Sequence, residues 1–282
     1  MLCCVFLKKR IKEVYDPILS MKRNDSILKE RITRFEKQIP DKIKEEMKGL
    51  ANGSGYSYED VLLIHTFLDA QPGQFGCTSM VVKETNKKCQ RIAAANHSLK
   101  SRYNRESQSR RQAFLDQSIS KKGLPQEVLK SAGKDVTIQA MVFDTSKGEI
   151  YLSSRATYAA SGKFIKFGPD LLFDSHKFGS TNSDNRVKLF RNLDWPWYFL
   201  GQETVVLARP QSNGNSTVSI SWPGYIGTLS GINNHGLALT ENQCGSGINL
   251  NGIPNPLLFT DILDTCKDVN KASQVIEKGL PW

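Results

Sequence analysis

The chain has 282 residues, of which 39% are hydrophobic and 23% charged, and its formal net charge is +10. This apolar content is sufficient for a packed core, and ordinary glycine and proline levels exclude a fibrous or wholly disordered chain. No stretch approaches the roughly 18–20 consecutive apolar residues of a membrane helix. The short apolar run at residues 2–7 is followed by its charges rather than preceded by them, which does not fit a signal peptide. We therefore expect a cytoplasmic protein, with export by another route left open.

Residues 8–50 carry apolar side chains at helical spacing among lysine and glutamate. Pro17 and Pro40 are expected to divide this run into separate helices, because proline lacks the backbone N–H that a helix interior requires. Ser57 is a suitable N-terminal cap and predicts a further helix that ends near Leu68.

Positive charge is concentrated between residues 83 and 134. Nucleic-acid binding would favour aromatic side chains among these charges, and only Tyr103 and Phe114 are present, so we expect no nucleic-acid partner. Two interpretations of the basic stretch remain open. It is either a solvated helical face or a surface that attracts an anionic membrane or an acidic substrate.

Beyond residue 73 the pattern changes from long helices to short strands. Strands are predicted at residues 77–83, 92–95, 136–144, 149–153, 204–209, 216–221 and 236–240. Helices are expected at residues 107–119 and 128–132, and a single amphipathic helix at 259–277. The prediction is an α+β fold with mostly antiparallel sheet, which suits a layered αββα sandwich.

The most informative residue is Cys77, which follows Gly76 and precedes two small polar residues. A nucleophilic thiol needs a base, a cation or dipole that holds the thiolate, and donors for the oxyanion. Residues 191–196, Arg-Asn-Leu-Asp-Trp-Pro, and residues 231–237, which lead to Asn242, could supply these groups. The 6 cysteines show no CxxC pairing and no zinc-ligand spacing. A thiol and an amine suffice for this chemistry, so neither a metal nor an organic cofactor is expected.

Three motifs together resemble the cysteine N-terminal-nucleophile hydrolases, a family that includes acid ceramidase, N-acylethanolamine acid amidase, the bile salt and penicillin V acylases and the penicillin-biosynthetic acyltransferase. They are residues 76–79, residues 191–196, and residues 222–227 followed by 231–233. The resemblance implies a self-cleaving amidase or acyltransferase, cut between Gly76 and Cys77, that acts on the C–N amide bond of an N-acyl amine or lipid amide through an acyl-thioester.

The same resemblance implies roles for individual residues. The α-amine of Cys77, released by the cut, has an ordinary pKa of about 8 and would serve as the base. Arg191 would hold the thiolate, Asp194 would orient the amine, and Asn242 would donate to the oxyanion. Two other interpretations stay open: Arg191 and Asp194 as a structural ion pair, and Asn242 as a turn residue.

Under this resemblance residues 1–76 form a helical propeptide-like segment, and residues 77–282 form the hydrolase-like domain. Residues 83–187 resemble a C-terminal portion of the family that here precedes the Arg-Asn-Leu-Asp motif instead of following it. Within that portion, candidate substrate-binding residues are Asn96, Arg110 and Arg111. Trp195 is a candidate for an apolar acyl pocket.

The rearranged order leaves two functions open. The first is an active self-cleaving enzyme, whose thioester is resolved by water or by an amine. The second is a catalytically inactive relative that binds a partner or an anionic membrane through the basic face at 83–134. Scission between Gly76 and Cys77 distinguishes them, because only the first requires it.

Overall fold

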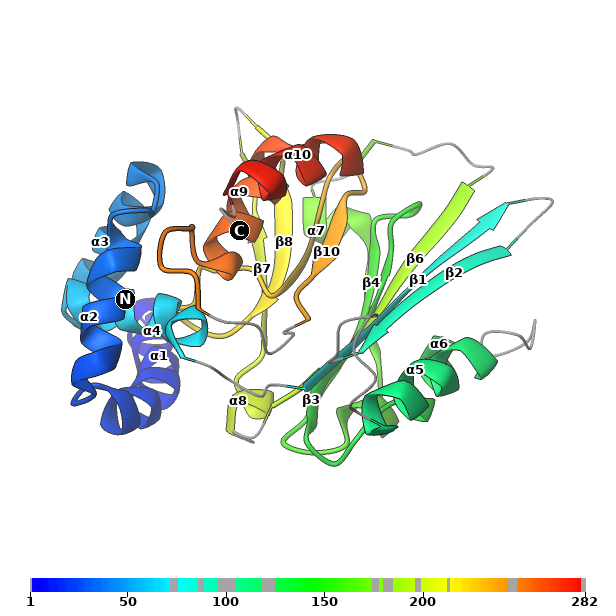
Figure 1. The fold of residues 1–282 in the computed structure, drawn as a ribbon, viewed down its shortest axis with the longest axis horizontal. Coiled ribbons are helices and arrows are strands. Elements are labelled where there is room, and N and C mark those ends of the chain that lie inside the picture. The colour runs from blue at the N-terminus through cyan, green and yellow to red at the C-terminus, as the bar shows by residue number, and fades with distance from the viewer. Residues whose placement is uncertain are drawn as a thin grey trace.

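The computed structural model describes residues 2–71, 76–85, 89–95, 105–117, 125–173, 178–179, 185–195, 199–211, 214–242 and 248–279. Helices come first along the chain, and two antiparallel sheets with further helices follow (Figure 1). This arrangement confirms the mixed α+β class. Among the described residues, no helix is both long enough and apolar enough to cross a bilayer.

The N-terminal segment consists of four helices: α1 (Leu2–Lys22), α2 (Ser26–Glu36), α3 (Asp41–Ser54) and α4 (Tyr58–Ala70). The predicted cap is confirmed, because Ser57 Oγ accepts a hydrogen bond from the backbone N–H of Asp60 at 3.1 Å. Pro40 also separates two helices as expected, since it stands directly before α3.

The predicted break at Pro17 is wrong, because Pro17 lies inside α1 and the chain turns only after Lys22. Val14 and Ile18, on either side of the proline, are 1% and 3% exposed. Burial of this face stabilises the helix by more than the hydrogen bond lost at the proline costs.

The larger sheet has six strands, in the spatial order β2-β1-β6-β3-β4-β5. Their bounds are β1 (Gly76–Thr85), β2 (Cys89–Ala95), β3 (Thr137–Asp144), β4 (Glu149–Ser154), β5 (Ile165–Phe167) and β6 (Asn185–Asp194). The predicted hairpin corresponds to β3 and β4, and Gly148 at its turn has a φ of 65°. The sequence did not predict β6, because buried polar residues such as Asn192 and Asp194 interrupt its apolar pattern.

The smaller sheet has four strands, in the order β10-β9-β8-β7. They are β7 (Val205–Arg209), β8 (Thr217–Ser221), β9 (Ser230–Asn233) and β10 (Ala238–Thr240). Three of these were predicted. β9 was not, because its four residues contain a single large apolar side chain, Ile232.

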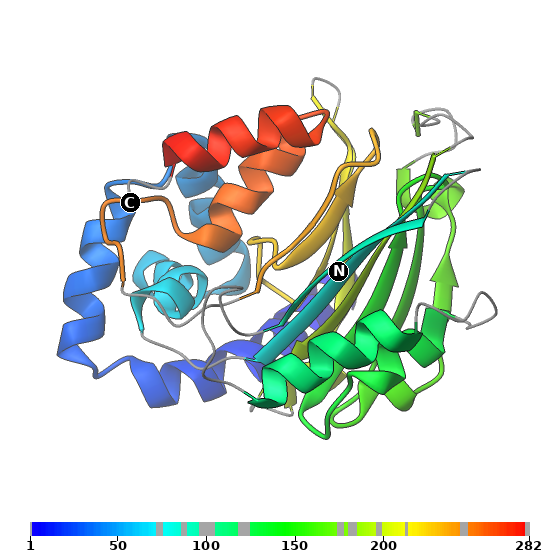
Figure 2. The ribbon, with the colours of Figure 1, turned by 45° about the vertical axis from the view of Figure 1, so that its right-hand side comes forward.

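Helices cover the outer face of each sheet, and the inner faces of the two sheets pack together (Figure 2). The inner-face core joins Met141 and Leu189 of the larger sheet to Val218 and Ile232 of the smaller one. The covering helices are α5 (Arg105–Gln117) and α6 (Pro125–Ser131) on the larger sheet, and α9 (Asn255–Thr265) and α10 (Val269–Gly279) on the smaller. Short helices complete the chain: η1 (Ala159–Ser161), α7 (Pro169–Phe173) and α8 (Phe199–Gln202).

The single C-terminal helix predicted at 259–277 is two helices, α9 and α10, with a break between them at Cys266. The carbonyl oxygen of Cys266 accepts hydrogen bonds from Asn215 Nδ2 and Asn233 Nδ2, both at 2.7 Å. Because these side chains bind the carbonyl oxygen of Cys266, the helix does not continue through this residue. Asp268 then starts α10 by accepting from the backbone N–H of Lys271 at 2.9 Å.

The chain leaves β1 and enters β6 at neighbouring positions of the larger sheet. β1 and β6 pair along their whole length, from Gly76 opposite Asp194 to Thr85 opposite Asn185. At about 3.3 Å per strand residue, the entry and exit points lie roughly 25 Å from Cys77. The strands between them in the sequence, β2 to β5, therefore lie on both sides of the β1–β6 pair and do not separate Cys77 from Arg191.

Candidate active site

The register of β1 and β6 brings Cys77 and Arg191 together, although 114 residues separate them. Cys77 lies opposite Leu193, and Arg191 lies opposite Ser79, so the four side chains share one face of the sheet. Arg191 Nη2 donates a hydrogen bond to Cys77 Sγ at 3.2 Å. Cys77 and Arg191 are 3% and 1% exposed. A buried guanidinium at this distance stabilises a thiolate relative to a thiol.

The amide of Asn242 lies beside this pair, held by its oxygen. Asn242 Oδ1 accepts from Ser79 Oγ at 2.9 Å and from Arg191 Nη1 at 3.2 Å. Because two donors face the oxygen, the NH₂ group points away from them and is the end that could donate to an oxyanion. Ser79 Oγ also contacts Thr240 Oγ1 at 3.0 Å.

Ser79 was not singled out from the sequence as a functional residue, although it lies in a motif that was. Its spacing from Cys77 was the signal that could have identified it. In a strand, residues i and i+2 point to the same face, so Ser79 had to share a face with Cys77.

Asp194 lies on the opposite face of β6 and has different partners. Thr137 Oγ1 donates to Asp194 Oδ1 at 2.6 Å, and Arg110 of α5 forms an ion pair with Oδ2. Arg110 Nε also donates to the carbonyl oxygen of Ala132 at 3.0 Å. The interpretation of Arg191 and Asp194 as an ion pair with each other is therefore not supported, since side chains three apart in a strand point to opposite faces. Asp194 stands opposite Gly76, directly before the thiol residue.

The thiol of Cys77 is protonated at neutral pH in this state of the chain. Burial raises the pKa of Cys77 to about 11, and the nearby carboxyl groups of Asp194 and Glu241 add to the increase. Arg191 acts in the opposite direction, but it does not outweigh the burial. The intact chain therefore holds its candidate nucleophile in an unreactive form.

Two carboxyl groups, Asp69 and Glu241, lie next to the thiol site. The backbone carbonyl of Glu241 accepts from Arg191 Nη1, and Asp69 Oδ1 accepts from the backbone N–H of Asn255 at 3.1 Å. The pKa values of both carboxyl groups are raised, chiefly by burial, and the Asp69 charge adds to the increase at Glu241. No sequence motif pointed to this pair, because Asp69 lies in the last turn of α4 and Glu241 follows the short strand β10.

A cavity of about 20 Å³ lies at the thiol, which is room for about one water molecule. It is lined by Leu68, Cys77, Arg191, Leu193, Trp195, Leu229 and Glu241. Leu68 belongs to α4, so the N-terminal segment forms part of the wall. The site as it stands has no space for an acyl chain.

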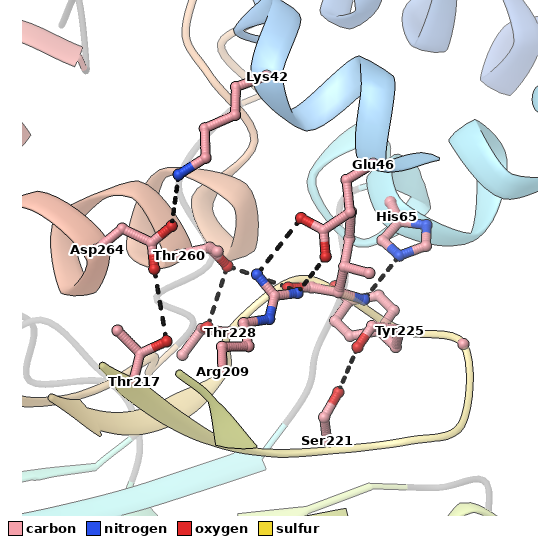
Figure 3. A network of polar contacts seen from close by, with 12 residues as sticks. Lys42, Glu46, His65, Arg209, Thr217, Ser221, Tyr225, Thr228, Thr260 and Asp264 are labelled. Atoms are coloured by element: carbon pink, nitrogen blue, oxygen red, sulfur yellow. Dashed lines mark hydrogen bonds and ion pairs between the residues drawn. The ribbon is translucent and has the colours of Figure 1, made fainter. Parts of the chain in front are cut away.

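Polar contacts join α3 and α4 of the N-terminal segment to the smaller sheet and to α9 (Figure 3). Lys42 of α3 forms an ion pair with Asp264 at 3.2 Å. In α4, His65 Nδ1 donates to the carbonyl of Val61 at 2.6 Å. Its Nε2 accepts from the backbone N–H of Ile226 at 2.9 Å. Burial lowers the pKa of His65 to about 4, so this fully buried ring is neutral.

The sequence-based candidates divide between the two faces of the sheet. Trp195 lines the thiol cavity and packs on Trp222, with ring centroids 5.6 Å apart. Arg110 is buried on the other face, where its guanidinium binds Asp194, and Arg111 beside it is half-buried. Asn96 lies outside the described residues.

No protein-family model matches this chain, and no curated protein matches it. Within the described ranges, no group of His, Cys, Asp or Glu side chains is arranged to hold a metal ion. The groups available for chemistry are a thiol, a guanidinium, a side-chain amide and a pair of carboxyl groups.

Proposed function

We propose that this chain is a self-cleaving cysteine amidase or acyltransferase of the N-terminal-nucleophile type, which acts on the C–N amide bond of an N-acyl amine or lipid amide. The observation that carries the proposal is the 3.2 Å contact from Arg191 Nη2 to Cys77 Sγ, with Asn242 bound to the same guanidinium. The order of layers, with helices on the outer faces of two packed sheets, supports an αββα sandwich of this type.

Scission between Gly76 and Cys77 would place a free α-amine on the residue that carries the thiol. An amine with a pKa near 8 accepts the thiol proton at close to neutral pH. The thiolate then attacks the amide carbonyl of the substrate, the amine portion leaves, and an acyl-thioester forms. Water or a second amine resolves the thioester and regenerates the thiol.

The neighbouring residues supply the remaining parts of the reaction. Arg191 stabilises the thiolate, and the NH₂ group of Asn242 stabilises the oxyanion, a contribution of about 3–4 kcal/mol for a well-placed donor. Asp194 lies opposite Gly76 in the ladder, and in this proposal it holds the new amine. Trp195 and Leu193 supply apolar surface for an acyl chain.

The intact chain is the inactive form in this proposal. Its thiol is buried and protonated, and Leu68 of the N-terminal segment helps to close the site. Scission separates that segment covalently from the domain, so that α4 can move away and substrate can enter.

The test is the intact mass of purified protein, wild type beside Cys77→Ala, over a range from acidic to neutral pH. We expect two fragments that join at Gly76/Cys77 in the wild type and a single chain in the variant. A wild type that stays uncut under every condition would overturn the proposal and favour an inactive relative.

A further inference from the structure

Self-cleavage needs a different base from the one proposed for turnover. Before the cut, the nitrogen of Cys77 belongs to a peptide bond and cannot accept a proton, so the α-amine proposed as the base does not yet exist. The thiol itself is strongly disfavoured as a thiolate, with a pKa raised to about 11. Another group must take its proton during the first reaction.

Glu241 is the group whose position fits this requirement. Glu241 lines the same small cavity as Cys77, and the charge of its carboxylate raises the pKa of the thiol. Its backbone carbonyl is bound to Arg191, the same guanidinium that donates to Cys77 Sγ. Glu241 Oε2 is sealed from solvent and has no hydrogen-bond partner among the described residues, so it is able to accept a proton.

We propose that Glu241 is the proton acceptor for the Cys77 thiol in the self-cleavage step. This inference rests on the proposed function, since it concerns the reaction that would produce the active enzyme. It assigns a base to the intact chain, and the α-amine takes over that role once the cut has been made.

The step is an N-to-S acyl shift followed by hydrolysis. The Glu241 carboxylate takes the proton from Cys77 Sγ, and the sulfur bonds to the carbonyl carbon of Gly76. The bond from that carbon to the Cys77 nitrogen breaks, and the nitrogen recovers the proton from the Glu241 carboxyl group. Water then cleaves the Gly76 thioester, which leaves a carboxylate on Gly76 and a free thiol and amine on Cys77.

The groups around Glu241 determine the pH at which it can act. Arg191 favours its carboxylate, whereas burial and the charge of Asp69 favour the protonated acid and raise its pKa. The hydroxyl of Tyr225 and the thiol of Cys77 also face the pair. The cleavage rate is therefore expected to rise with pH as Glu241 loses its proton. Because the charge of Asp69 raises the pKa of Glu241, the rate should rise at a higher pH than it would without Asp69.

Radiolabelled full-length chain from cell-free translation, transferred into buffers of different pH, gives the rate of scission directly. Glu241→Gln keeps the shape of the side chain but cannot accept the proton, and we expect its cleavage to be about 100-fold slower or more. The matched control is Asp69→Asn, which removes the other carboxyl group of the pair. It should still cleave, with its rate–pH profile displaced to lower pH, because Glu241 has lost a neighbouring negative charge.

Chemical rescue separates a lost base from a misfolded chain. Glu241→Ala makes room at the cavity, and formate is expected to restore its scission in a concentration-dependent way. A Glu241→Gln chain that cuts at the wild-type rate, or an Asp69→Asn profile that does not move, would overturn this inference while the proposed function stands. A folded Glu241→Ala chain that formate does not rescue would overturn it equally. If the wild type itself is never cut, both proposals fail.

Discussion

The two faces of the sheet at the paired ends of β1 and β6 are closed by different parts of the chain. On the inner face, Cys77 shares its cavity with Leu68 of α4, which precedes the proposed cleavage site. On the outer face, Asp194 is covered by Arg110 of α5, which follows that site. A cut between Gly76 and Cys77 would therefore release only the segment that closes the thiol cavity, and not the helix that covers Asp194. The inner face carries the thiol and its guanidinium, whereas the outer face carries a buried ion pair that supports Asp194, the residue proposed to hold the new amine.

The strongest test of this division is Cys77→Ala. It should abolish both scission and amide turnover while leaving the thermal midpoint of unfolding close to that of the uncut chain, because a small apolar side chain replaces a buried thiol. The matched control is Cys266→Ala, at a buried cysteine in the break between α9 and α10. Scission and turnover should persist in the control. Mass spectrometry and release of the amine from an N-acyl amine report the two activities.

Arg110→Met tests the opposite face. Removing the guanidinium leaves Asp194 with a buried charge and no ion-pair partner, which costs about 3–5 kcal/mol in unfolding free energy. Adding Asp194→Asn should recover part of that loss, since the buried charge is then gone. Urea denaturation measures both variants. If Arg110→Met instead left stability unchanged and abolished scission, Arg110 would take part in the cut itself rather than support Asp194.

Arg191→Lys keeps the positive charge on the inner face but removes the planar guanidinium, whose N–H groups form a fork of hydrogen-bond donors. A lysine cannot donate to Cys77, Asn242 and the backbone of Glu241 simultaneously in the way the guanidinium does. We expect turnover to fall about 100-fold. The pH dependence of thiol alkylation in the cleaved enzyme provides a second readout, because weaker support for the thiolate raises the pKa of Cys77. Equal activity and an unchanged alkylation profile would contradict the role given to the fork.

Ser79→Ala should have the smallest effect of the four. It leaves the nucleophile and the guanidinium in place but removes the hydroxyl that donates to Asn242 Oδ1 and helps to orient the amide. We expect kcat to fall about tenfold with little change in KM, as for a group that positions an oxyanion donor. Ser219→Ala, at another buried serine on a strand, is the control and should be silent. A change in KM alone would show that Ser79 acts on substrate binding instead.

Local signals predicted much of the fold. The cap at Ser57 and the β3–β4 hairpin were predictable because a few adjacent residues determine them. Where a distant partner decided the outcome, the local pattern was misleading. The C-terminal helix ends at Cys266 because Asn215 and Asn233 bind its carbonyl, and neither is near it in the sequence.

By itself, the sequence determined the kinds of group available at the candidate site: a thiol at Cys77, a guanidinium at Arg191 and an amide at Asn242. Only the tertiary structure decided which of them touch, which face each occupies, and that Asp69 and Glu241 lie beside them. The physical reason is strand register. A hydrogen bond at about 3 Å across a sheet depends on pairing between strands far apart in the chain, and shifting that pairing by one residue would turn every side chain to the other face.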